Sequence, residues 1–247
     1  MAETFKVRLM QRSFLGLAIA VFIAACGSDS SGPGAGFECL GAALPTTAPS
    51  TIILGGQILQ NALAPTALAG AEVIASKTGT DTLAATTSST PGFYSLSIST
   101  GGTPVDGFLF VSKSGYITTY AYPSRPLAAN DTTNVLVITA SEFTLLGNAV
   151  GVTHTAGDGS IGIVVRDCDG NPLTGATVAS SPPGVIKYNA AGAPSSSATS
   201  TSADGVAYIL NVAAGSVTVM GTANGHTLRQ HIVNARADVI TLTELQP

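Results

Sequence analysis

The chain has 247 residues, with 10 Lys or Arg and 14 Asp or Glu, and a formal net charge of −4. Only 10% of the residues are charged, and the sequence contains no basic patch. This composition argues against a nucleic-acid-binding protein. The length allows one or two domains.

The chain begins with what looks like an export signal. Lys6, Arg8 and Arg12 form a positive segment, and residues 14–25 are an uninterrupted run of apolar and small side chains. The run is short for a membrane-spanning helix but has the length of a signal-peptide core. It ends in Ile-Ala-Ala directly before Cys26, the pattern that a lipoprotein signal peptidase needs. We therefore predict a bacterial lipoprotein; an ordinary secretory signal and an N-terminal membrane anchor are the alternatives.

Lipidated Cys26 would anchor the protein in a membrane of the cell envelope. Gly27, which follows it, lacks the acidic character that retains some lipoproteins in the inner membrane, so we expect the outer membrane. Met10 would also start a complete signal. Residues 27–50 are rich in Ser, Gly, Pro, Ala and Thr and are expected to form a flexible tether.

Two further cysteines, Cys39 and Cys168, are left over after lipidation. An exported protein lies in an oxidising compartment, and both residues lie in polar sequence contexts. We therefore predict a disulfide between them. Two separate buried thiols are the alternative.

From residue 51 onwards, short β-like runs alternate with turn signals. Tyr94, Leu96 and Ile98 alternate with serines, as in a strand with one buried face. A helical turn is expected at 141–146, with Ser141 as its N-cap. The strands of the first set are expected at 51–60, 71–76, 83–89, 93–99, 107–114, 116–122 and 134–139.

A second set of strands follows in matching order. It is expected at 160–167, 176–181, 197–202, 206–212, 216–223, 227–233 and 237–245. Leu68–Val73 parallels Leu173–Val178, and Pro91-Gly92 parallels Asp204-Gly205. The fold class is thus predicted as all-β, with two tandem antiparallel β-sandwich domains of transthyretin-like or Ig-like type. Their predicted bounds are 51–140 and 159–247, with a linker at 141–158, after a signal at 1–25 and a tether at 26–50.

Two segments of the second repeat, Asp167–Val178 and Thr199–Gly205, carry a family resemblance. They resemble the carboxypeptidase regulatory-like domain, a transthyretin-like β-sandwich. The Asp-Gly-Asn-Pro sequence at 169–172 suits a hairpin turn, whereas 61–66 replaces it in the first repeat. The resemblance implies an accessory, non-enzymatic domain and no substrate.

The sequence contains no pattern of a catalytic, metal or cofactor site. His154, His226 and His231 lack the spacing of zinc ligands. Asp167 and Asp169 resemble the start of a calcium loop, but the later Glu is missing and a hairpin turn explains them. We expect no catalytic residue, no bound metal and no cofactor.

Three tyrosines remain as a candidate binding surface. Tyr116, Tyr120 and Tyr122 share parity, so on a regular strand they project from one face. Exposed, they could form a platform for a sugar ring or a protein partner; packing in the core is the favoured alternative. The predicted function is a membrane-anchored, non-catalytic interaction or structural module with an unidentified partner, and the alternative is a glycan-binding surface lipoprotein.

Overall fold

The computed structural model describes residues 34–77, 79 and 81–247, so the predicted signal and Cys26 lie outside the described residues. The first half contains β1 (Thr51–Gln60), β2 (Thr66–Ala67), β3 (Glu72–Ser76), β4 (Ala84–Thr87), β5 (Phe93–Ser99), β6 (Phe108–Ser112), β7 (Thr119–Ala121), β8 (Asp131–Thr132) and β9 (Val135–Val137). Helix α1 (Ala140–Ala149) follows. The second half contains β10 (Asp158–Val165), β11 (Thr177–Ser181), β12 (Val185–Ala190), β13 (Ala193–Ser195), β14 (Val206–Ala213), β15 (Gly215–Ala223), β16 (His226–Thr227), β17 (His231–Ala235) and β18 (Ile240–Leu245).

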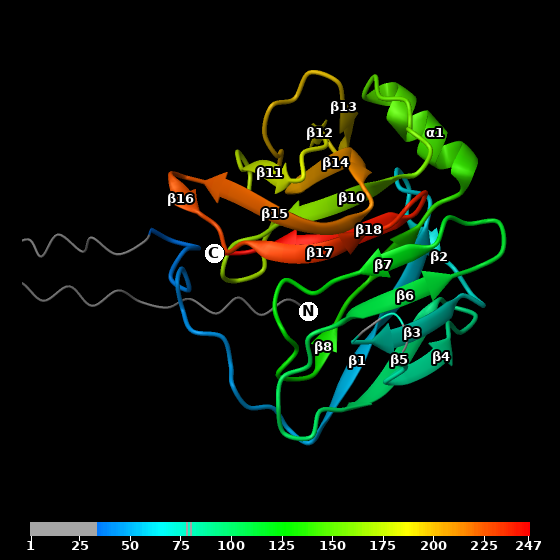
Figure 1. The fold of residues 1–247 in the computed structure, drawn as a ribbon, viewed down its shortest axis with the longest axis vertical. Helices are drawn as coiled ribbons and strands as arrows, with labels where there is room; N and C mark the ends of the chain where they lie inside the picture. Colours follow the sequence, from blue (N-terminus) through cyan, green and yellow to red (C-terminus); the bar gives the residue numbers. More distant parts are fainter. Residues whose placement is uncertain (1–33, 78, 80) are drawn as a thin grey trace, which may run out of the picture. The chain divides into compact units, whose positions relative to one another are not determined.

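Strands from both halves form one nine-stranded sheet, in the order β13-β12-β14-β10-β18-β7-β6-β3-β4 (Figure 1). The halves meet where β18 pairs in parallel with β7. A second sheet joins β1 with β2, β5, β8 and β9, and a third joins β15 with β11, β16 and β17. The predicted all-β sandwich fold is confirmed. The sheets are mixed instead of purely antiparallel, because β18 also pairs in parallel with β10, and β1 pairs in parallel with β8 and β9.

The second and third sheets cover opposite faces of the shared sheet. Residues paired across two strands point to the same face, and successive residues alternate. Ala121 and its partner Leu242 face the first core, which the sheet around β1 closes. Tyr120 and its partner Thr241 face the other way, on the side where Ile161 lies in the second core. The outer face of each half therefore continues the core face of the other half.

The first core confirms the alternation predicted from the sequence. In β5, Tyr94, Leu96 and Ile98 are buried and the residues between them are exposed. Ile98 pairs with Ile52 of β1, which is also buried. Burial of one such aliphatic side chain contributes about 1.5–3 kcal/mol. This gain on one face is the physical reason why the segment forms a strand.

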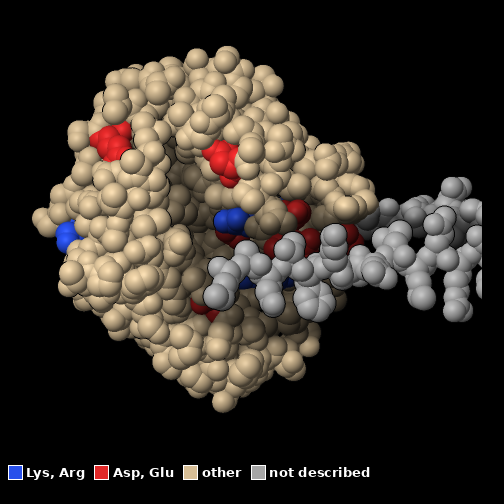
Figure 2. Space-filling view, turned by 180° about the vertical axis from the view of Figure 1, so that it is seen from behind, with Lys and Arg blue, Asp and Glu red and all other residues tan. Residues whose placement is uncertain are grey.

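Charged side chains are sparse on the surface. Figure 2 shows a face on which most of the visible Lys, Arg, Asp and Glu side chains lie in and around a central hollow, amid neutral side chains. The residues of β5 that face solvent show what covers the surface where charged side chains are missing. Ser95, Ser97 and Ser99 are all exposed. Uncharged hydroxyl groups thus provide much of the polar surface.

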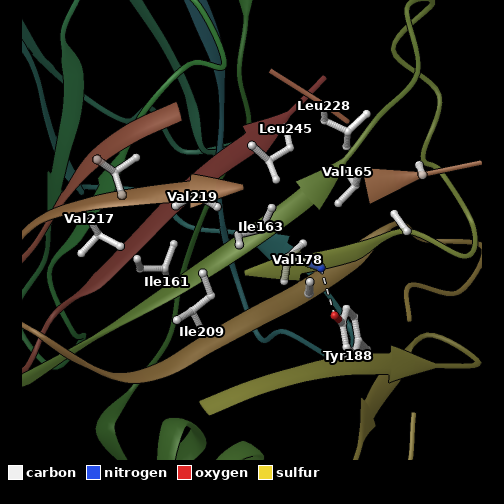
Figure 3. Close-up of a cluster of buried hydrophobic side chains, with 14 of the residues drawn as sticks. Ile161, Ile163, Val165, Val178, Tyr188, Ile209, Val217, Val219, Leu228 and Leu245 are labelled. Carbon is white, nitrogen blue, oxygen red and sulfur yellow. Dashed lines mark hydrogen bonds between the residues drawn. The ribbon is translucent and has the colours of Figure 1, made fainter. Parts of the chain in front are cut away.

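The second core lies between the shared sheet and the sheet around β15 (Figure 3). Ile161 and Ile163 of β10 are almost completely buried, as is Val219 of β15. Tyr188 reaches the same core from β12, and its hydroxyl accepts a hydrogen bond from the backbone N–H of Val178 (3.0 Å). The one polar atom that this ring brings into the core is therefore paired.

The two halves use the same hydrogen-bond network, as expected for repeated units. The Ser88 hydroxyl accepts from the backbone N–H of Ala71 (2.9 Å) and donates to the carbonyl three residues before Ala71 (2.8 Å). The Thr201 hydroxyl accepts from the N–H of Ala176 (2.9 Å) and donates to the carbonyl three residues before Ala176 (2.6 Å). One side chain thus connects the same two loops in each half.

A glycine holds the same place in each repeat. Gly92 and Gly205 have φ angles of 78° and 68°. A Cβ atom would lie 2.9 Å from the carbonyl oxygen of Ile58 at the first position and 2.5 Å from that of Val165 at the second. Both the positive φ and the close approach require glycine. The predicted correspondence of these two turns is confirmed.

The strand expected at 197–202 is wrong, because this segment is a loop. The Thr201 hydroxyl makes the two bonds to the backbone of residues 173–176 described above. Just before the segment, Ser195 Oγ accepts from the N–H of Ala198 (3.2 Å), and a local bond of this kind competes with strand pairing. The segment that does form strands here is the less regular one at 185–195.

Helix α1 is longer than the turn expected at 141–146, and its N-cap is Thr139 instead of Ser141. Thr139 has an extended backbone (φ −77°, ψ 160°), and its hydroxyl accepts from the N–H of Glu142 (3.2 Å). Ser141 lies two residues after the N-cap, inside the first turn, and cannot make this contact. In the described part of the chain, no helix has the length and hydrophobicity needed to cross a membrane.

Candidate functional site

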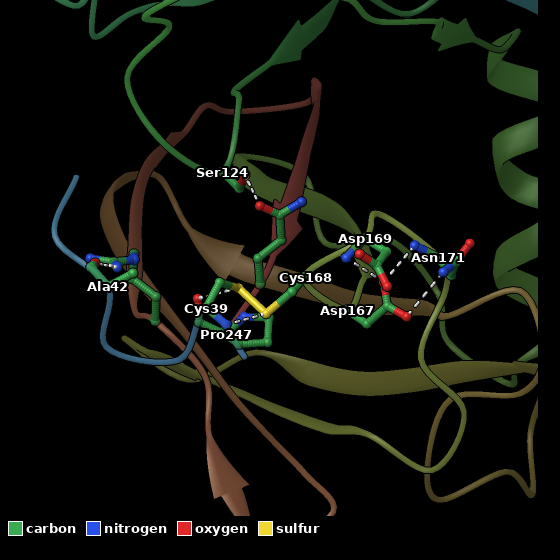
Figure 4. The surroundings of a disulfide bond; sticks show 10 residues. Cys39, Ala42, Ser124, Asp167, Cys168, Asp169, Asn171 and Pro247 are labelled. Carbon is green, nitrogen blue, oxygen red and sulfur yellow. Dashed lines mark hydrogen bonds between the residues drawn. A yellow bond between two sulfur atoms is a disulfide. The ribbon is translucent and has the colours of Figure 1, made fainter. Parts of the chain in front are cut away.

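Cys39 and Cys168 form a disulfide across a sequence separation of 129 residues, which confirms the predicted pairing (Figure 4). The backbone N–H of Cys168 donates to the carbonyl of Gly36 (2.9 Å). Pro247 lies beside the bond, within reach of the Cys39 sulfur (4.0 Å). Three segments that are distant in the sequence therefore meet at this point.

The segment around Cys39 is attached to the second half of the molecule, although the first half follows it in the chain. The Phe37 side chain is buried in the second core and its ring lies 4.8 Å from that of His226. The Arg229 guanidinium donates to the carbonyl of Ala42 (2.6 Å). The chain therefore contacts the second sandwich before it enters β1 of the first.

The turn that follows Cys168 uses its own carboxylate. Asp167 accepts hydrogen bonds from the backbone N–H groups of Asp169 (3.0 Å) and Asn171 (2.7 Å) and from the Asn171 side chain (3.1 Å). Desolvation raises the pKa of Asp167, but these bonds outweigh it, so the pKa lies below its usual value. Within the described residues, no group of three or more His, Cys, Asp or Glu side chains could hold a metal ion.

The structure separates Tyr116 from the other two candidate tyrosines. The Tyr116 hydroxyl donates to Gln60, and its ring packs against the first core. Strand β7 contains only residues 119–121, and a turn at Lys113 precedes Tyr116, so the parity argument does not extend to it. A platform of three aromatic rings is therefore not formed.

Tyr120 and Tyr122 lie together, but a cation covers them. The Arg236 guanidinium carbon is 3.6 Å from the centre of the Tyr120 ring and 5.0 Å from that of Phe108. The same guanidinium donates to the Tyr122 hydroxyl (3.1 Å). Each ring is half-buried. This cluster joins the two halves beside the β7–β18 pairing, and Arg236 covers one face of the Tyr120 ring.

The three histidines have separate partners. His226 stacks near Phe37, and His154 Nε2 lies 2.9 Å from an Asp238 carboxylate oxygen. His231 Nδ1 lies 2.7 Å from the Thr243 hydroxyl. Burial lowers the pKa of His231, against a smaller opposing effect of the Asp106 charge.

A cavity of about 270 Å³ lies between α1 and the outer face of the shared sheet in its second half. Phe143 and Leu146 line it from the helix, and Leu210, Ile240 and Leu242 line it from the sheet. None of the side chains that line it is Asp, Glu, Lys or Arg. No residue within α1 is buried, so the helix covers the cavity without filling it.

Two polar atoms of the cavity lining are buried and, among the described residues, have no hydrogen-bond partner: Ser160 Oγ and His154 Nδ1. Ser160 is 5% exposed and pairs with Ile240, so it faces the cavity. His154 Nε2 lies 2.9 Å from an Asp238 carboxylate oxygen, so Nδ1 is the ring nitrogen that is left without a partner. A buried polar atom without a partner costs about 1–3 kcal/mol.

Sequence reasoning missed this cavity. Ser160 stands at the start of an apolar strand, which is the only local sign of a polar group on a buried face. The cavity itself depends on α1 crossing the outer face of a sheet, and the helix carries too weak an apolar pattern to indicate that position.

No family model matches the chain, and no curated protein matches it. Among solved structures, a Streptococcal ancillary pilin is 8% identical, with a TM-score of 0.25 over 80% of this chain and 62% of the pilin. The shaft pilin SpaA from Lactobacillus rhamnosus GG is 12% identical, with a TM-score of 0.25 over 80% of this chain and 98% of the pilin. A cohesin–X-dockerin complex from Acetivibrio cellulolyticus is 14% identical, with a TM-score of 0.27 over 42% of this chain and 65% of that chain.

The chain thus spans under two thirds of the ancillary pilin and of the cohesin-complex chain. Similarity at this level carries no inference about family or function. The β-sandwich class rests on the strands and cores of this molecule, and the carboxypeptidase regulatory-like family stays a prediction.

Proposed function

We propose that this protein is a lipoprotein of the bacterial cell envelope, anchored through Cys26 in the outer membrane, whose two-sandwich body is a non-catalytic interaction or structural module. The lipobox sequence supports the anchor. The observation that carries the role is the disulfide that ties the tether to the second sandwich. It gives the body a fixed point of attachment to the chain that leads to the membrane.

The disulfide also limits how far the body extends from the membrane. Twelve residues lie between Cys26 and Cys39, so thirteen residue steps connect the two cysteines. A fully extended chain spans at most about 3.6 Å per residue, so this tether reaches at most about 47 Å. A body held at this distance is suited to partners that lie on or near the same membrane.

We also propose that both sandwiches are carboxypeptidase regulatory-like domains. The Asp167–Asn171 turn supports this for the second copy, and the shared Ser88 and Thr201 network extends it to the first. The glycan-binding alternative has less support, because Arg236 occupies the face of Tyr120 that a sugar ring would need.

The anchor is tested by metabolic labelling with a clickable fatty acid in the native host, followed by membrane fractionation. Cys26→Ala should abolish the label and release the protein from the membrane. The Cys39→Ala/Cys168→Ala double variant is the matched control, and it should keep the fatty-acid label and stay in the membrane fraction. Label that persists in Cys26→Ala would refute the anchor.

The interaction role is tested by photocross-linking in intact cells, with the photoreactive residue placed at exposed Phe93 or Ile232. We expect a discrete adduct that requires the intact anchor. Turnover of a substrate by the purified protein, abolished by a single polar substitution, would contradict a non-catalytic role.

A further inference from the structure

We propose that the cavity beneath α1 binds a small uncharged molecule that is largely apolar and carries one hydroxyl group, such as a hydroxylated aromatic or alicyclic compound. This site is separate from the anchor and from the module role proposed above. It rests on the size of the cavity, the absence of charge in its lining and two unpartnered polar atoms.

The volume sets the size of the ligand. A dry cavity of 150 Å³ in a protein interior is known to accept benzene. The cavity of about 270 Å³ is nearly twice that size. It therefore has room for a molecule of about a dozen non-hydrogen atoms.

The lining sets the charge of the ligand. No Asp, Glu, Lys or Arg side chain lines the cavity, and the one imidazole ring in the lining, His154, already has the Asp238 carboxylate 2.9 Å from its Nε2. Tyr208, which also lines it, stays protonated, because burial and the nearby Asp204 charge raise its pKa to about 12. Its hydroxyl is already used, since it donates to Asn189 Oδ1 (2.8 Å). An ionised ligand would lose its hydration and would meet no Asp, Glu, Lys or Arg side chain in the lining to compensate for it.

The two unpartnered atoms set the polar group. Ser160 Oγ can donate or accept, and His154 Nδ1 accepts or donates according to where the ring carries its protons. A ligand hydroxyl both donates and accepts, so it can pair with either atom. Both atoms are already removed from water in the free protein. A hydrogen bond from the ligand to either atom therefore contributes more binding free energy than the same bond at an exposed site.

Helix α1 is held at its ends and is free of buried residues along its length. Thr139 caps the start, and the Glu142 carboxylate accepts from the backbone N–H of Ala62 (2.6 Å). At the other end, the N–H of Val152 donates to the carbonyl of Gly147 (2.9 Å). Between these ends the Phe143 ring packs edge-on against the His154 ring (5.3 Å between centroids), but no helix side chain fills the space beneath.

The test uses residues 27–247, since all described strands, both cores and the disulfide lie within one compact unit, 33–247. The probes are 1-naphthol, naphthalene and 1-naphthoate, which share a ring system and differ in the polar group. We expect saturable binding of 1-naphthol, binding of naphthalene about three- to tenfold weaker, and no binding of 1-naphthoate.

Two variants identify the site. Ser160→Ala should remove most of the preference for 1-naphthol over naphthalene while leaving the Tm unchanged or raised, because the unpartnered hydroxyl is lost. Leu210→Trp should fill the cavity and abolish binding of both probes. Leu145→Trp is the matched control: Leu145 is 61% exposed on α1 and outside the lining, so binding should be unchanged.

Absence of saturable binding by both neutral probes would overturn the proposal. So would equal affinity for 1-naphthol and naphthalene in the unmodified protein, or a loss of binding in Leu145→Trp as large as in Leu210→Trp. A fall in the Tm of Ser160→Ala would show instead that this hydroxyl has a structural partner.

Discussion

At the scale of the residue, three buried hydroxyl groups have different consequences. Ser88 and Thr201 each bridge a backbone N–H and a carbonyl group, and so close the same loop in the two halves. Ser160 is equally buried and bridges nothing in the described structure. The first two stabilise the fold, whereas the third adds a desolvation cost that a hydrogen bond to a ligand would offset.

Replacing the bridging hydroxyls should destabilise the protein. Ser88→Ala and Thr201→Ala each leave two buried backbone groups unpaired, so the free energy of unfolding should fall by about 1–3 kcal/mol in denaturant titrations. Thr201→Ser keeps the hydroxyl and should recover most of the loss. If exposed Ser97→Ala costs as much as Ser88→Ala, the bridging account is wrong.

Asp204 should make the stability depend on pH. Desolvation raises the pKa of Asp204. Hydrogen bonds from Asn189, Ser202 and the backbone of Val206 together lower it by more than desolvation raises it, so the pKa in the folded protein lies below that in the unfolded protein. The stabilisation is therefore complete above the unfolded pKa of about 3.9 and is lost as the pH falls through the folded pKa.

The expected result is that Asp204→Asn lowers the free energy of unfolding at pH 7 and that the difference from the unmodified protein narrows towards pH 2. Thermal unfolding between pH 2 and pH 7 measures both. Asp169→Asn, at an exposed position of a neighbouring loop, serves as the control. If the difference in free energy of unfolding between Asp204→Asn and the unmodified protein stayed constant from pH 2 to pH 7, Asp204 would not be the source of the pH dependence.

At the scale of the element, sequence patterns succeeded where one face of a strand is buried. Strand β5 is found at the residues predicted, because Tyr94, Leu96 and Ile98 alternate with serines. The patterns failed at 197–202, a loop in which the Thr201 hydroxyl bonds to the backbone of the distant segment 173–176. They also misplaced the cap of α1, since Thr139 and Ser141 are both acceptable N-cap residues and only the backbone geometry distinguishes them.

This distinction gives a prediction for α1. Thr139→Ala removes the cap and should cost about 1 kcal/mol of helix stability, whereas Ser141→Ala should cost only a few tenths. Hydrogen exchange of the amides of α1 reports the local effect directly. Equal effects of the two substitutions would show that Thr139 is not the N-cap.

At the scale of the whole molecule, the sequence indicated two sandwiches but not their union. Nothing in the pattern of 116–122 or 237–245 shows that β7 and β18 pair with each other, because pairing between distant strands depends on the complete fold. The cavity was beyond prediction for the same reason. The disulfide was predictable, since Cys39 and Cys168 were the only cysteines left after Cys26.

Removing the disulfide should loosen the molecule in one region first. In the chain-entropy model, a loop of 129 residues contributes up to about 5 kcal/mol. Cys39→Ala/Cys168→Ala should lower the Tm and expose residues 34–50 to protease at temperatures where both sandwiches stay folded. Cys26→Ala should change neither. Unchanged protease resistance would mean that Phe37 and the Arg229 contact suffice to hold this segment.

The position of β18 has a consequence for the order of folding. It follows every other described strand in the chain, yet it lies in the middle of the nine-stranded sheet, between β10 and β7. Until residues 240–245 emerge, the edge of β7 is open, and an open strand edge invites pairing with other chains. The first half can form early, but the second core, which includes Leu245, and the union of the two halves must wait for the last strand, which makes this step the slow and vulnerable one.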